Sequence, residues 1–391
     1  MTILWLDLET FSECDLTTRG THRYATDPST EVIVAQWAVE DGEPVVVDCT
    51  DDSAVEIGVL RRVLAAPSTI VYAHNSFFDR TILREVWGID VPIERWRDTM
   101  VQAYAHGLPG ALGKAGAVMG LPLDEQKDKR GKQLIHLFCK PQPKNHTLRR
   151  ATRETHPEEW QEFLWYSRQD IVAMRATSKA LPVWNYGPGE IGTKIIRQWH
   201  ADQRANDRGF AVDLELTHAA IKATDTEKAR LKAETQAATM GEVGNISQRD
   251  QLLRYILEAY GVALPDLKAD TLRRRIEDPE LPAGVRLLLE IRLEATKAST
   301  AKYAAVVRSV SADGRLRGSM QFGGAQRTLR WAHRMVQPGN MPRPTLHLSA
   351  EEMEAAIWLM KHDRAGEVFD DVMELAANMV RGVIVAPPER K

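Results

Sequence analysis

Residues 1–12 read MTILWLDLETFS, and the part from residue 3 to residue 9 decides the fold. Its mostly apolar side chains predict a β-strand that is covered on both faces. Because side chains alternate along a strand, Asp7 and Glu9 share one face, with Cα atoms about 7 Å apart. Two buried carboxylates this close raise each other's pKa unless a cation lies between them. The stretch therefore predicts a central strand that supplies two ligands to a divalent metal.

The chain has 391 residues, which favours two or three domains. It is 43% hydrophobic and 27% charged, as in ordinary globular proteins, and its formal net charge of −3 neither favours nor excludes nucleic acid. Three cysteines without CxxC spacing exclude a thiolate zinc cluster and a disulfide framework, and indicate a reducing compartment. We find no signal segment and no long apolar run, so we expect a cytoplasmic protein without a membrane partner.

Strands and helices alternate in the first 182 residues, which predicts an α/β domain with a mixed central sheet flanked by helices. The predicted strands are 2–9, 31–39, 44–49 and 69–73, and the predicted helices are 54–65, 76–87, 98–106, 111–119 and 158–180. The Pro- and Gly-rich stretch LPVWNYGPGE (181–190) is typical of a domain boundary. A largely helical region then extends to about residue 310, where a turn-and-strand pattern returns.

Two later segments add polar residues that match the strand pair. TIVYAHNSFFDRTIL (69–83) predicts a strand that runs into Asn75 as an N-cap and a helix with Asp79 in its first turn, where an ionised carboxylate is favoured. EEWQEFLWYSRQDIVAM (158–174) places Tyr166 and Asp170 on one helix face. Each pattern alone is common: a first-turn Asp suits any helix, and YxxxD often arises by chance. Their order along the chain indicates one shared site.

These three segments resemble the motifs of the DEDD superfamily of 3′→5′ exonucleases, in its tyrosine subclass. The histidine subclass would have a histidine where Trp165 stands. The resemblance implies an RNase H-like fold and two divalent cations, which oxygen ligands would select as Mg²⁺ or Mn²⁺ rather than zinc. In such an enzyme Tyr166 would orient the attacking water. The carboxylates implied as catalytic metal ligands are Asp7, Glu9, Asp79 and Asp170.

The same resemblance implies contacts with the substrate strand. Thr10, Asn75 and Phe78 correspond to positions that hold and wedge the terminal nucleotide at the 3′ end. Residues 126–153 carry nine Lys and Arg and one acid, Asp128. This stretch is either a solvated loop or a track for a phosphate backbone, and the sequence leaves both interpretations open.

The second half resembles the thumb and the start of the palm of family A (DNA polymerase I-like) enzymes, particularly those of phages. The resemblance rests on residues 245–261, 287–307 and above all 313–344, DGRLRGSMQFGGAQRTLRWAHRMVQPGNMPRP. It implies that Arg327, Arg330 and Arg334 contact the sugar–phosphate backbone of a primer–template, as arginine forks suit phosphate oxygens. A solvated basic hairpin is the alternative. Leu329 departs from the family pattern, which has glycine there.

The two resemblances divide the chain into four predicted parts. These are an exonuclease domain (1–182), a connection (183–210), a helical thumb (211–310) and an incomplete α+β palm (311–391). The similarity stops before the first polymerase aspartate, and we interpret His362-Asp363 as surface charge on a helix. We therefore expect no polymerase active site in this chain. It would be a piece cut before the palm, one half of a split polymerase whose second chain carries palm and fingers, or a degenerate fragment.

The predicted function is a metal-dependent 3′→5′ proofreading exonuclease of DNA replication, joined to part of a phage-type polymerase and located in the host cytoplasm. It would remove nucleoside 5′-monophosphates from single-stranded DNA 3′ ends by two-metal hydrolysis. Two alternatives stay open. One is an RNA-trimming exonuclease similar to RNase D, and the other is a DNA-binding or assembly subunit of a split polymerase.

Overall fold

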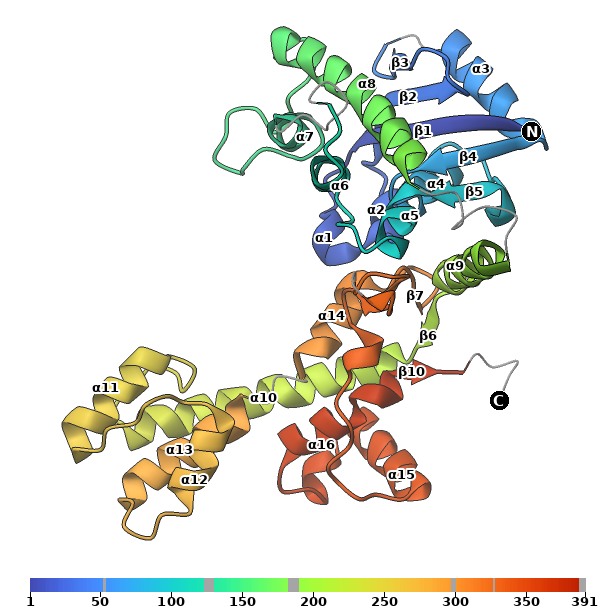
Figure 1. Ribbon diagram of the computed structural model, residues 1–391. Helices are drawn as coiled ribbons and strands as arrows, with labels where there is room; N and C mark the ends of the chain where they lie inside the picture. The colour runs from blue at the N-terminus through green and yellow to red at the C-terminus, as the bar shows by residue number, and fades with distance from the viewer. Residues whose placement is uncertain (52–53, 123–129, 182–189, 297–299, 326–327, 387–391) are drawn as a thin grey trace. The chain divides into compact units, whose positions relative to one another are not determined.

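The computed structural model describes residues 1–51, 54–122, 130–181, 190–296, 300–325 and 328–386 (Figure 1). The chain divides into two compact units, and each is built from two stretches of sequence. The first unit comprises Met1–Gly209 and Ser309–Gln337, and the second comprises Phe210–Arg308 and Pro338–Lys391. This division differs from the predicted boundary near residue 310, because the segment 309–337 packs with the first unit.

The first unit alternates strands and helices as the sequence predicts, apart from the short strand β5 and the helices α1, α2 and α7, which were not predicted. The elements of its first stretch are β1 (Thr2–Phe11), α1 (Leu16–Arg19), α2 (Thr21–Ala25), β2 (Glu31–Val39), β3 (Val45–Asp48), α3 (Ala54–Ala65), β4 (Thr69–Ala73), α4 (Phe77–Glu85), β5 (Trp96–Asp98), α5 (Thr99–Ala105), α6 (Leu112–Val118), α7 (Gly131–Phe138), α8 (Pro157–Ala180) and α9 (Glu190–Arg208). Its second stretch adds β7 (Arg315–Leu316), β8 (Met320–Gln321) and β9 (Ala332–His333).

Among the described residues, five strands form the main sheet in the order β3-β2-β1-β4-β5. The central strand β1 pairs antiparallel with β2 and parallel with β4, so the predicted mixed sheet is confirmed. The β1–β2 register shifts between Glu9 and Thr10, which indicates a β-bulge. A bulge turns the strand locally, so it re-aims the side chains at the end of β1.

The two faces of β1 have different environments, as strand alternation predicts. Leu4, Leu6 and Leu8 are almost fully buried in the core that contains α3 and α4 side chains. The opposite face is crossed by α8 (Figure 1), where Trp5 packs with Ile171 and other apolar side chains. Asp7 and Glu9 lie on this second face, in line with Trp5. The helix α8 thus packs against Trp5 of β1 through apolar side chains, and it meets Asp7 and Glu9 of the same strand through Asp170.

The segment 309–337 is held to the first unit by buried polar contacts. Trp331 donates its Nε1–H to Asp202 of α9 at 2.7 Å, and the backbone N–H of Met320 is bound by Asn206 at 3.1 Å. Burial raises the pKa of Asp202 to about 6. Phe322 of the same segment is buried in the core beneath the main sheet. These contacts join residues more than 100 positions apart, so no local sequence pattern reveals them.

The second unit is mostly helical, as predicted. Its elements are β6 (Phe210–Val212), α10 (Leu214–Ala238), α11 (Arg249–Tyr260), α12 (Ala269–Ile276), α13 (Ala283–Ala295), α14 (Ala301–Ser309), α15 (Ala350–Lys361), α16 (Val372–Met379) and β10 (Ile384–Val385), with β10 antiparallel to β6. Apolar side chains of α10–α13 form one core. His362 and Asp363 follow α15 and are exposed, as predicted for surface charge. None of the helices described is long and apolar enough to cross a membrane.

Candidate metal centre and cleft

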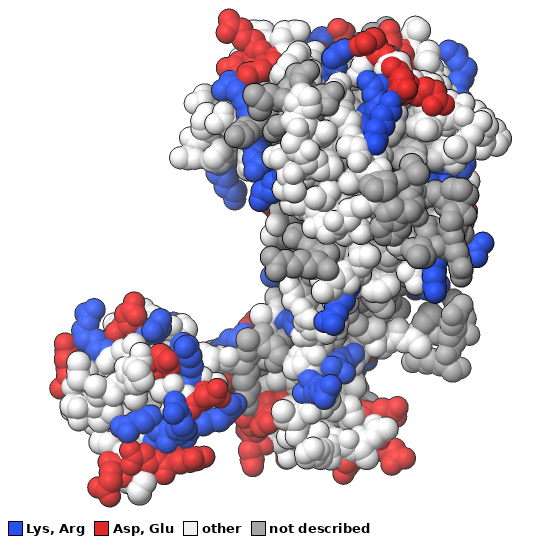
Figure 2. All heavy atoms as spheres, in the orientation of Figure 1, with Lys and Arg blue, Asp and Glu red and all other residues white. Residues whose placement is uncertain are grey.

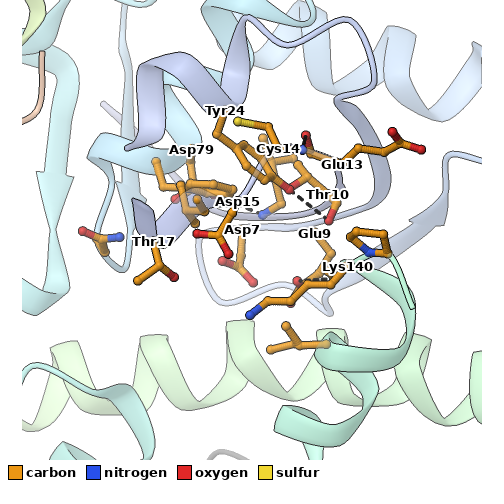
Figure 3. Close-up of a pocket in the computed structure, with 18 of the residues that line it drawn as sticks. Asp7, Glu9, Thr10, Glu13, Cys14, Asp15, Thr17, Tyr24, Asp79 and Lys140 are labelled. Carbon is orange, nitrogen blue, oxygen red and sulfur yellow. Dashed lines mark hydrogen bonds between the residues drawn. The ribbon is translucent and has the colours of Figure 1, made fainter. Parts of the chain in front are cut away.

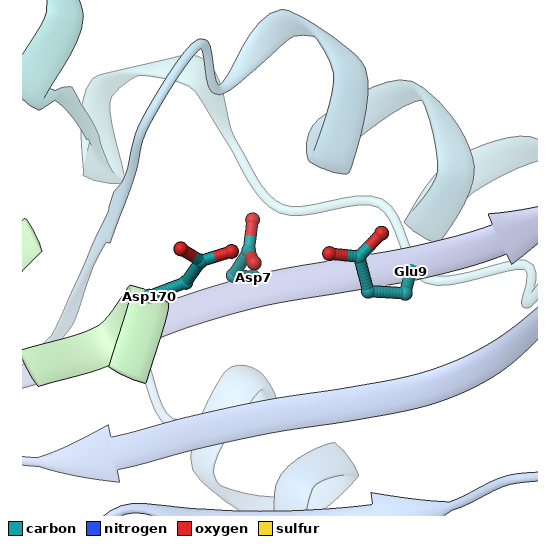
Figure 4. Close-up of side chains that lie close together, drawn as sticks. All are labelled: Asp7, Glu9 and Asp170. Carbon is teal, nitrogen blue, oxygen red and sulfur yellow. The ribbon is translucent and has the colours of Figure 1, made fainter. Parts of the chain in front are cut away.

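Three carboxylates meet on the α8 face of the sheet. Asp7 and Glu9 project from β1, and Asp170 reaches them from α8 (Figure 4). Each side chain offers a carboxylate oxygen, and these oxygens all lie within 4.8 Å of one another. Such spacing suits ions that bind oxygen ligands at about 2.0–2.6 Å. Side chains that are far apart in sequence thus form one cluster, as the order of the motifs predicts.

Asp79 lies beside this cluster, in the first turn of α4, and its side chain is almost completely buried. Its Oδ1 accepts the backbone N–H of Leu8 at 3.1 Å, which ties α4 to β1 between the two strand carboxylates. Burial and then the nearby Asp7 carboxylate raise the pKa of Asp79 well above its usual range. The fourth predicted carboxylate therefore borders the cluster and is not one of the three that share it.

Two residues that the sequence analysis missed fix the strand carboxylates. Gln36 of β2 is fully buried and donates its Nε2–H to Asp7 Oδ2 at 2.5 Å. Cys139 donates its Sγ–H to Glu9 Oε2 at 3.6 Å, and burial raises the pKa of this thiol well above its usual range. The signal for Gln36 was present: it is the one amide in the otherwise apolar stretch EVIVAQWAV. Cys139 has no comparable signal.

A cavity of about 500 Å³ opens beside the strand carboxylates of the cluster (Figure 3). Asp7, Glu9 and Asp79 are among the residues that line it, and so are the three predicted nucleotide-contact residues Thr10, Asn75 and Phe78. Thr10 is hydrogen-bonded to the Tyr24 hydroxyl at 2.7 Å, and the Tyr24 ring lies 5.9 Å from the Phe78 ring between centroids. The structure thus places all three in the same cavity as the carboxylates Asp7, Glu9 and Asp79.

Asp98 holds the turn that presents Asn75, and the sequence analysis missed it. Its carboxylate accepts the backbone N–H groups of Asn75 at 3.1 Å and of Ser76 at 2.8 Å, together with the Ser76 hydroxyl at 2.9 Å. It also caps α5 through the N–H groups of Met100 and Val101. Burial raises the pKa of Asp98 despite these donors.

Asn75 itself has φ of +66°, so the predicted N-cap role is wrong. The helix α4 begins after Ser76, which occupies the N-cap position. The left-handed backbone of Asn75 is one that asparagine tolerates better than most residues. Since the Asp98 carboxylate accepts the backbone N–H groups of Asn75 and Ser76, it holds this strained turn in place.

Tyr166 lies one helical turn before Asp170 on α8 and is completely buried. Its ring stacks on Phe163 with centroids 6.3 Å apart, and Gly131 of α7 lies directly against the same ring. Burial first, and then the carboxylates of Asp170, Glu9 and Asp7, raise the pKa of Tyr166 far above its ordinary value. The phenol is therefore a protonated hydrogen-bond donor next to the cluster and not a base.

Replacing Gly131 by alanine tests this contact. A methyl group at residue 131 would overlap the Tyr166 ring, and overpacking of this kind costs about 1–3 kcal/mol, more than the gain of at most about 1 kcal/mol from helix propensity. We expect Gly131→Ala to lower the thermal unfolding temperature. Gly58 of α3 is the matched control, because an added Cβ there meets nothing within 4 Å. Equal stabilisation of both variants would show that α7 does not press on Tyr166.

The three arginines predicted to bind a primer–template are placed differently from one another. Arg327 lies outside the described residues. Arg330 and Arg334 are exposed on the segment 309–337. Leu329 has φ of +52°, a left-handed conformation that glycine adopts at lower cost, which gives the family pattern a physical reason. On the face shown in Figure 2, basic and acidic side chains are intermixed over α11–α13 of the predicted thumb.

Sequence and structure comparisons with known proteins both point to DNA polymerases. A scan against models of protein families finds no match. The chain is 34% identical over 364 residues to a protein named DNA polymerase from Bacillus phage SP02, an alignment that covers 92% of this chain and 54% of that protein. The fold also matches the POL domain of Pol1 from M. smegmatis, solved in complex with DNA primer-template and dNTP. That match has a TM-score of 0.51 at 15% sequence identity and covers 88% of this chain and 53% of the other.

The sequence is therefore similar over most of its length to a phage DNA polymerase, and its fold matches that of the POL domain of Pol1, which is consistent with the resemblance to phage-type, DNA polymerase I-like (family A) enzymes. It spans about half the length of the phage relative that it matches. The likeness to the M. smegmatis structure concerns the fold alone, at its low sequence identity.

Proposed function

We propose that the first unit is a metal-dependent 3′→5′ exonuclease that removes nucleoside 5′-monophosphates from DNA ends. The observation that carries the proposal is the convergence of Asp7, Glu9 and Asp170 within 4.8 Å, with Asp7 and Glu9 also lining a cavity of about 500 Å³. DNA is the favoured substrate over RNA because the sequence relative is a DNA polymerase. Proofreading during DNA replication is the corresponding role.

The donor set fits hard divalent cations. The cluster offers carboxylate oxygens only, partly or fully buried, which suits Mg²⁺ or Mn²⁺ and disfavours zinc. Asp7, Glu9 and Asp170 would hold the cations. Asp79, on α4, would add a fourth carboxylate at the border of the cluster. When bound, two such ions activate water and stabilise the leaving 3′ oxygen.

The remaining side chains act on the substrate strand. In this proposal Thr10 and Asn75 hold the terminal nucleotide, and Phe78 gives its base an aromatic surface for stacking, an interaction worth about 1–3 kcal/mol per base. Tyr166 donates a hydrogen bond that orients the attacking water, since its raised pKa keeps the proton on the hydroxyl. Gln36 and Cys139 keep the Asp7 and Glu9 carboxylates in position through the hydrogen bonds described above.

The rest of the chain would serve the polymerase to which this unit is joined. We propose that residues 211–310 act as a thumb and that 311–391 include the start of a palm, with a single-stranded 3′ end and a primer–template as DNA partners. Polymerisation would require palm and fingers elements beyond those described, supplied in the same protein or by a second chain. Mixing the chain with a palm–fingers fragment and measuring primer extension tests this part separately.

Degradation of an end-labelled oligonucleotide tests the nuclease directly. With Mg²⁺ or Mn²⁺, we expect stepwise shortening of 5′-labelled single-stranded DNA from its 3′ end, release of 5′-mononucleotides, and arrest by a chelator. A matched RNA strand should be cut much more slowly. Equal or faster cutting of RNA would favour the RNA-trimming alternative, and absence of metal-dependent shortening would favour a purely structural subunit.

A further inference from the structure

A second cavity of about 480 Å³ lies next to the one over the carboxylates, within the first unit. One side is formed by the start of α4 and by α5, and the other by the segment 309–337. Gly318 makes this approach possible: a Cβ there would lie 2.8 Å from the Phe77 ring. The segment that resembles a primer–template-binding part of the polymerase is thus a wall of a cavity in the first unit.

The two cavities share a common rim. Leu16, Thr17, Asn75 and Phe78 line both of them. Phe77, the neighbour of Phe78, lines only the second. Consecutive aromatic residues at the start of α4 therefore face neighbouring spaces, and Asp98 holds the turn just before them. A strand whose last nucleotide occupies the first cavity has its next nucleotides at this rim.

The two cavities differ in the charged groups that line them. The first contains Asp7, Glu9 and Asp79, where bound cations would meet the scissile phosphate, together with Lys140. The second contains Arg334 and the buried Asp98, whose carboxylate accepts the amide and hydroxyl donors of the turn described above. Arg334 Nε and Nη2 both donate to Gln321 Oε1, at 3.0 and 2.6 Å, and Gln321 in turn donates to the Tyr104 hydroxyl at 3.1 Å. The guanidinium is thereby fixed in orientation, and with five N–H donors it has capacity left for a phosphate oxygen.

We propose that the second cavity binds the nucleotides immediately 5′ of the scissile bond, with Phe77 as a stacking surface and Arg334 as the phosphate ligand. This inference rests on the proposed nuclease function and assigns Arg334 to the strand being degraded, whereas the sequence analysis assigned it to duplex DNA. The segment 309–337 then helps to select a single strand of several nucleotides over a lone nucleotide.

The test compares substrates with and without upstream nucleotides, using the whole chain. The p-nitrophenyl ester of thymidine 5′-monophosphate presents a single nucleotide, and the tetranucleotide dT4 also presents its 5′ neighbours. We expect Arg334→Ala to lower kcat/KM for dT4 by about tenfold more than for the ester, because it removes a charge-assisted hydrogen bond. Arg334→Lys should recover part of the loss. Arg62→Ala, on the exposed face of α3, is the control and should leave the ratio unchanged.

A binding measurement separates this inference from the proposed function. Fluorescence anisotropy of labelled dT4 is measured with the Asp7→Asn chain, alone and combined with Arg334→Ala, so no hydrolysis is needed. Weaker binding of dT4 in the double variant supports the inference, even if the wild-type chain proves inactive and the nuclease proposal fails. Unchanged binding of dT4 in the double variant would overturn the inference, and so would an equal loss of kcat/KM with dT4 and with the ester.

Discussion

Replacing Asp7 by asparagine is expected to reduce metal-dependent hydrolysis of single-stranded DNA by about 10³-fold or more, equivalent to ~4 kcal/mol of transition-state stabilisation. Asp7 shares the cluster with Glu9 and Asp170, and its charge contributes to the raised pKa of Asp79. Asparagine keeps the shape and can still accept the hydrogen bond from Gln36, but it has no charge for a cation. Initial rates with 5′-labelled DNA measure the effect, and Glu56→Gln on α3 serves as the control.

The same variant should be more stable than the wild-type protein when no metal is present. Removing one of several neighbouring carboxylates that are partly or fully buried relieves repulsion worth about 1–2 kcal/mol. The pKa of Asp79 is raised in the folded chain, so its protonated form favours folding at low pH. That contribution is lost as the pH rises through the folded-state pKa. Metal-free stability should therefore fall from acid towards neutral pH, and less steeply in Asp7→Asn.

Thermal unfolding in a chelator, at several pH values, measures this second effect. Added Mn²⁺ should raise the unfolding temperature of the wild-type chain and have little effect on Asp7→Asn, since ligands that bind only the native state stabilise it. A variant that loses stability in the chelator while keeping its nuclease activity would contradict both the repulsion and the metal site.

Replacing Asp98 by alanine is expected to lower the free energy of unfolding by about 3–5 kcal/mol. One buried carboxylate accepts hydrogen bonds from the Asn75, Ser76, Met100 and Val101 amides and from the Ser76 hydroxyl. Alanine leaves these donors without their buried acceptor. Because Asn75 is no longer held in its left-handed conformation, nuclease activity should also fall, mainly through a higher KM for DNA. Chemical unfolding and steady-state kinetics measure the two effects.

An ordinary helix cap provides the comparison. Asp371 caps α16 in the second unit by accepting the N–H of Glu374, so Asp371→Ala should cost only about 1 kcal/mol and leave KM unchanged. The loss of unfolding free energy in Asp98→Asn should lie between those of Asp98→Ala and Asp371→Ala. The asparagine Oδ1 still accepts hydrogen bonds, but its amide N–H faces the Ser76 donors. If Asp98→Ala behaves like Asp371→Ala, then Asp98 is a helix cap and does not position Asn75.

The carboxylate cluster could be predicted because its geometry follows from local rules. Alternation puts Asp7 and Glu9 on one face of β1, and a spacing of four residues puts Tyr166 and Asp170 on one face of α8. The order of these motifs along the chain then indicated that the carboxylate face of β1 and the Tyr166 face of α8 meet. The residues that hold the cluster could not be found in this way. Asp98 acts on a turn 22 or 23 positions away in sequence, through main-chain groups that carry no sequence signature.

The domain boundaries also depend on contacts between residues that are distant in sequence, so they could be predicted only in part. Composition marks the Pro- and Gly-rich stretch after residue 181, but nothing local shows that the segment 309–337 leaves the helical part and packs with α9. That choice depends on pairs such as Trp331 with Asp202, which become visible only in three dimensions. Side-chain roles beyond proximity, including those of Tyr166 and the arginines, remain predictions until the variants are measured.

The backbone passes between the two units three times, at residues 209–210, 308–309 and 337–338. This has a consequence for recombination between related genes. Exchange at one crossover point, for example near residue 250, would combine β1 and α8 from one parent with the Phe322 and Trp331 segment from the other. Mismatched partners would then share a single core. We expect viable hybrids to inherit residues 1–209 and 309–337 together, so these stretches should have a common history even where the helices between them do not.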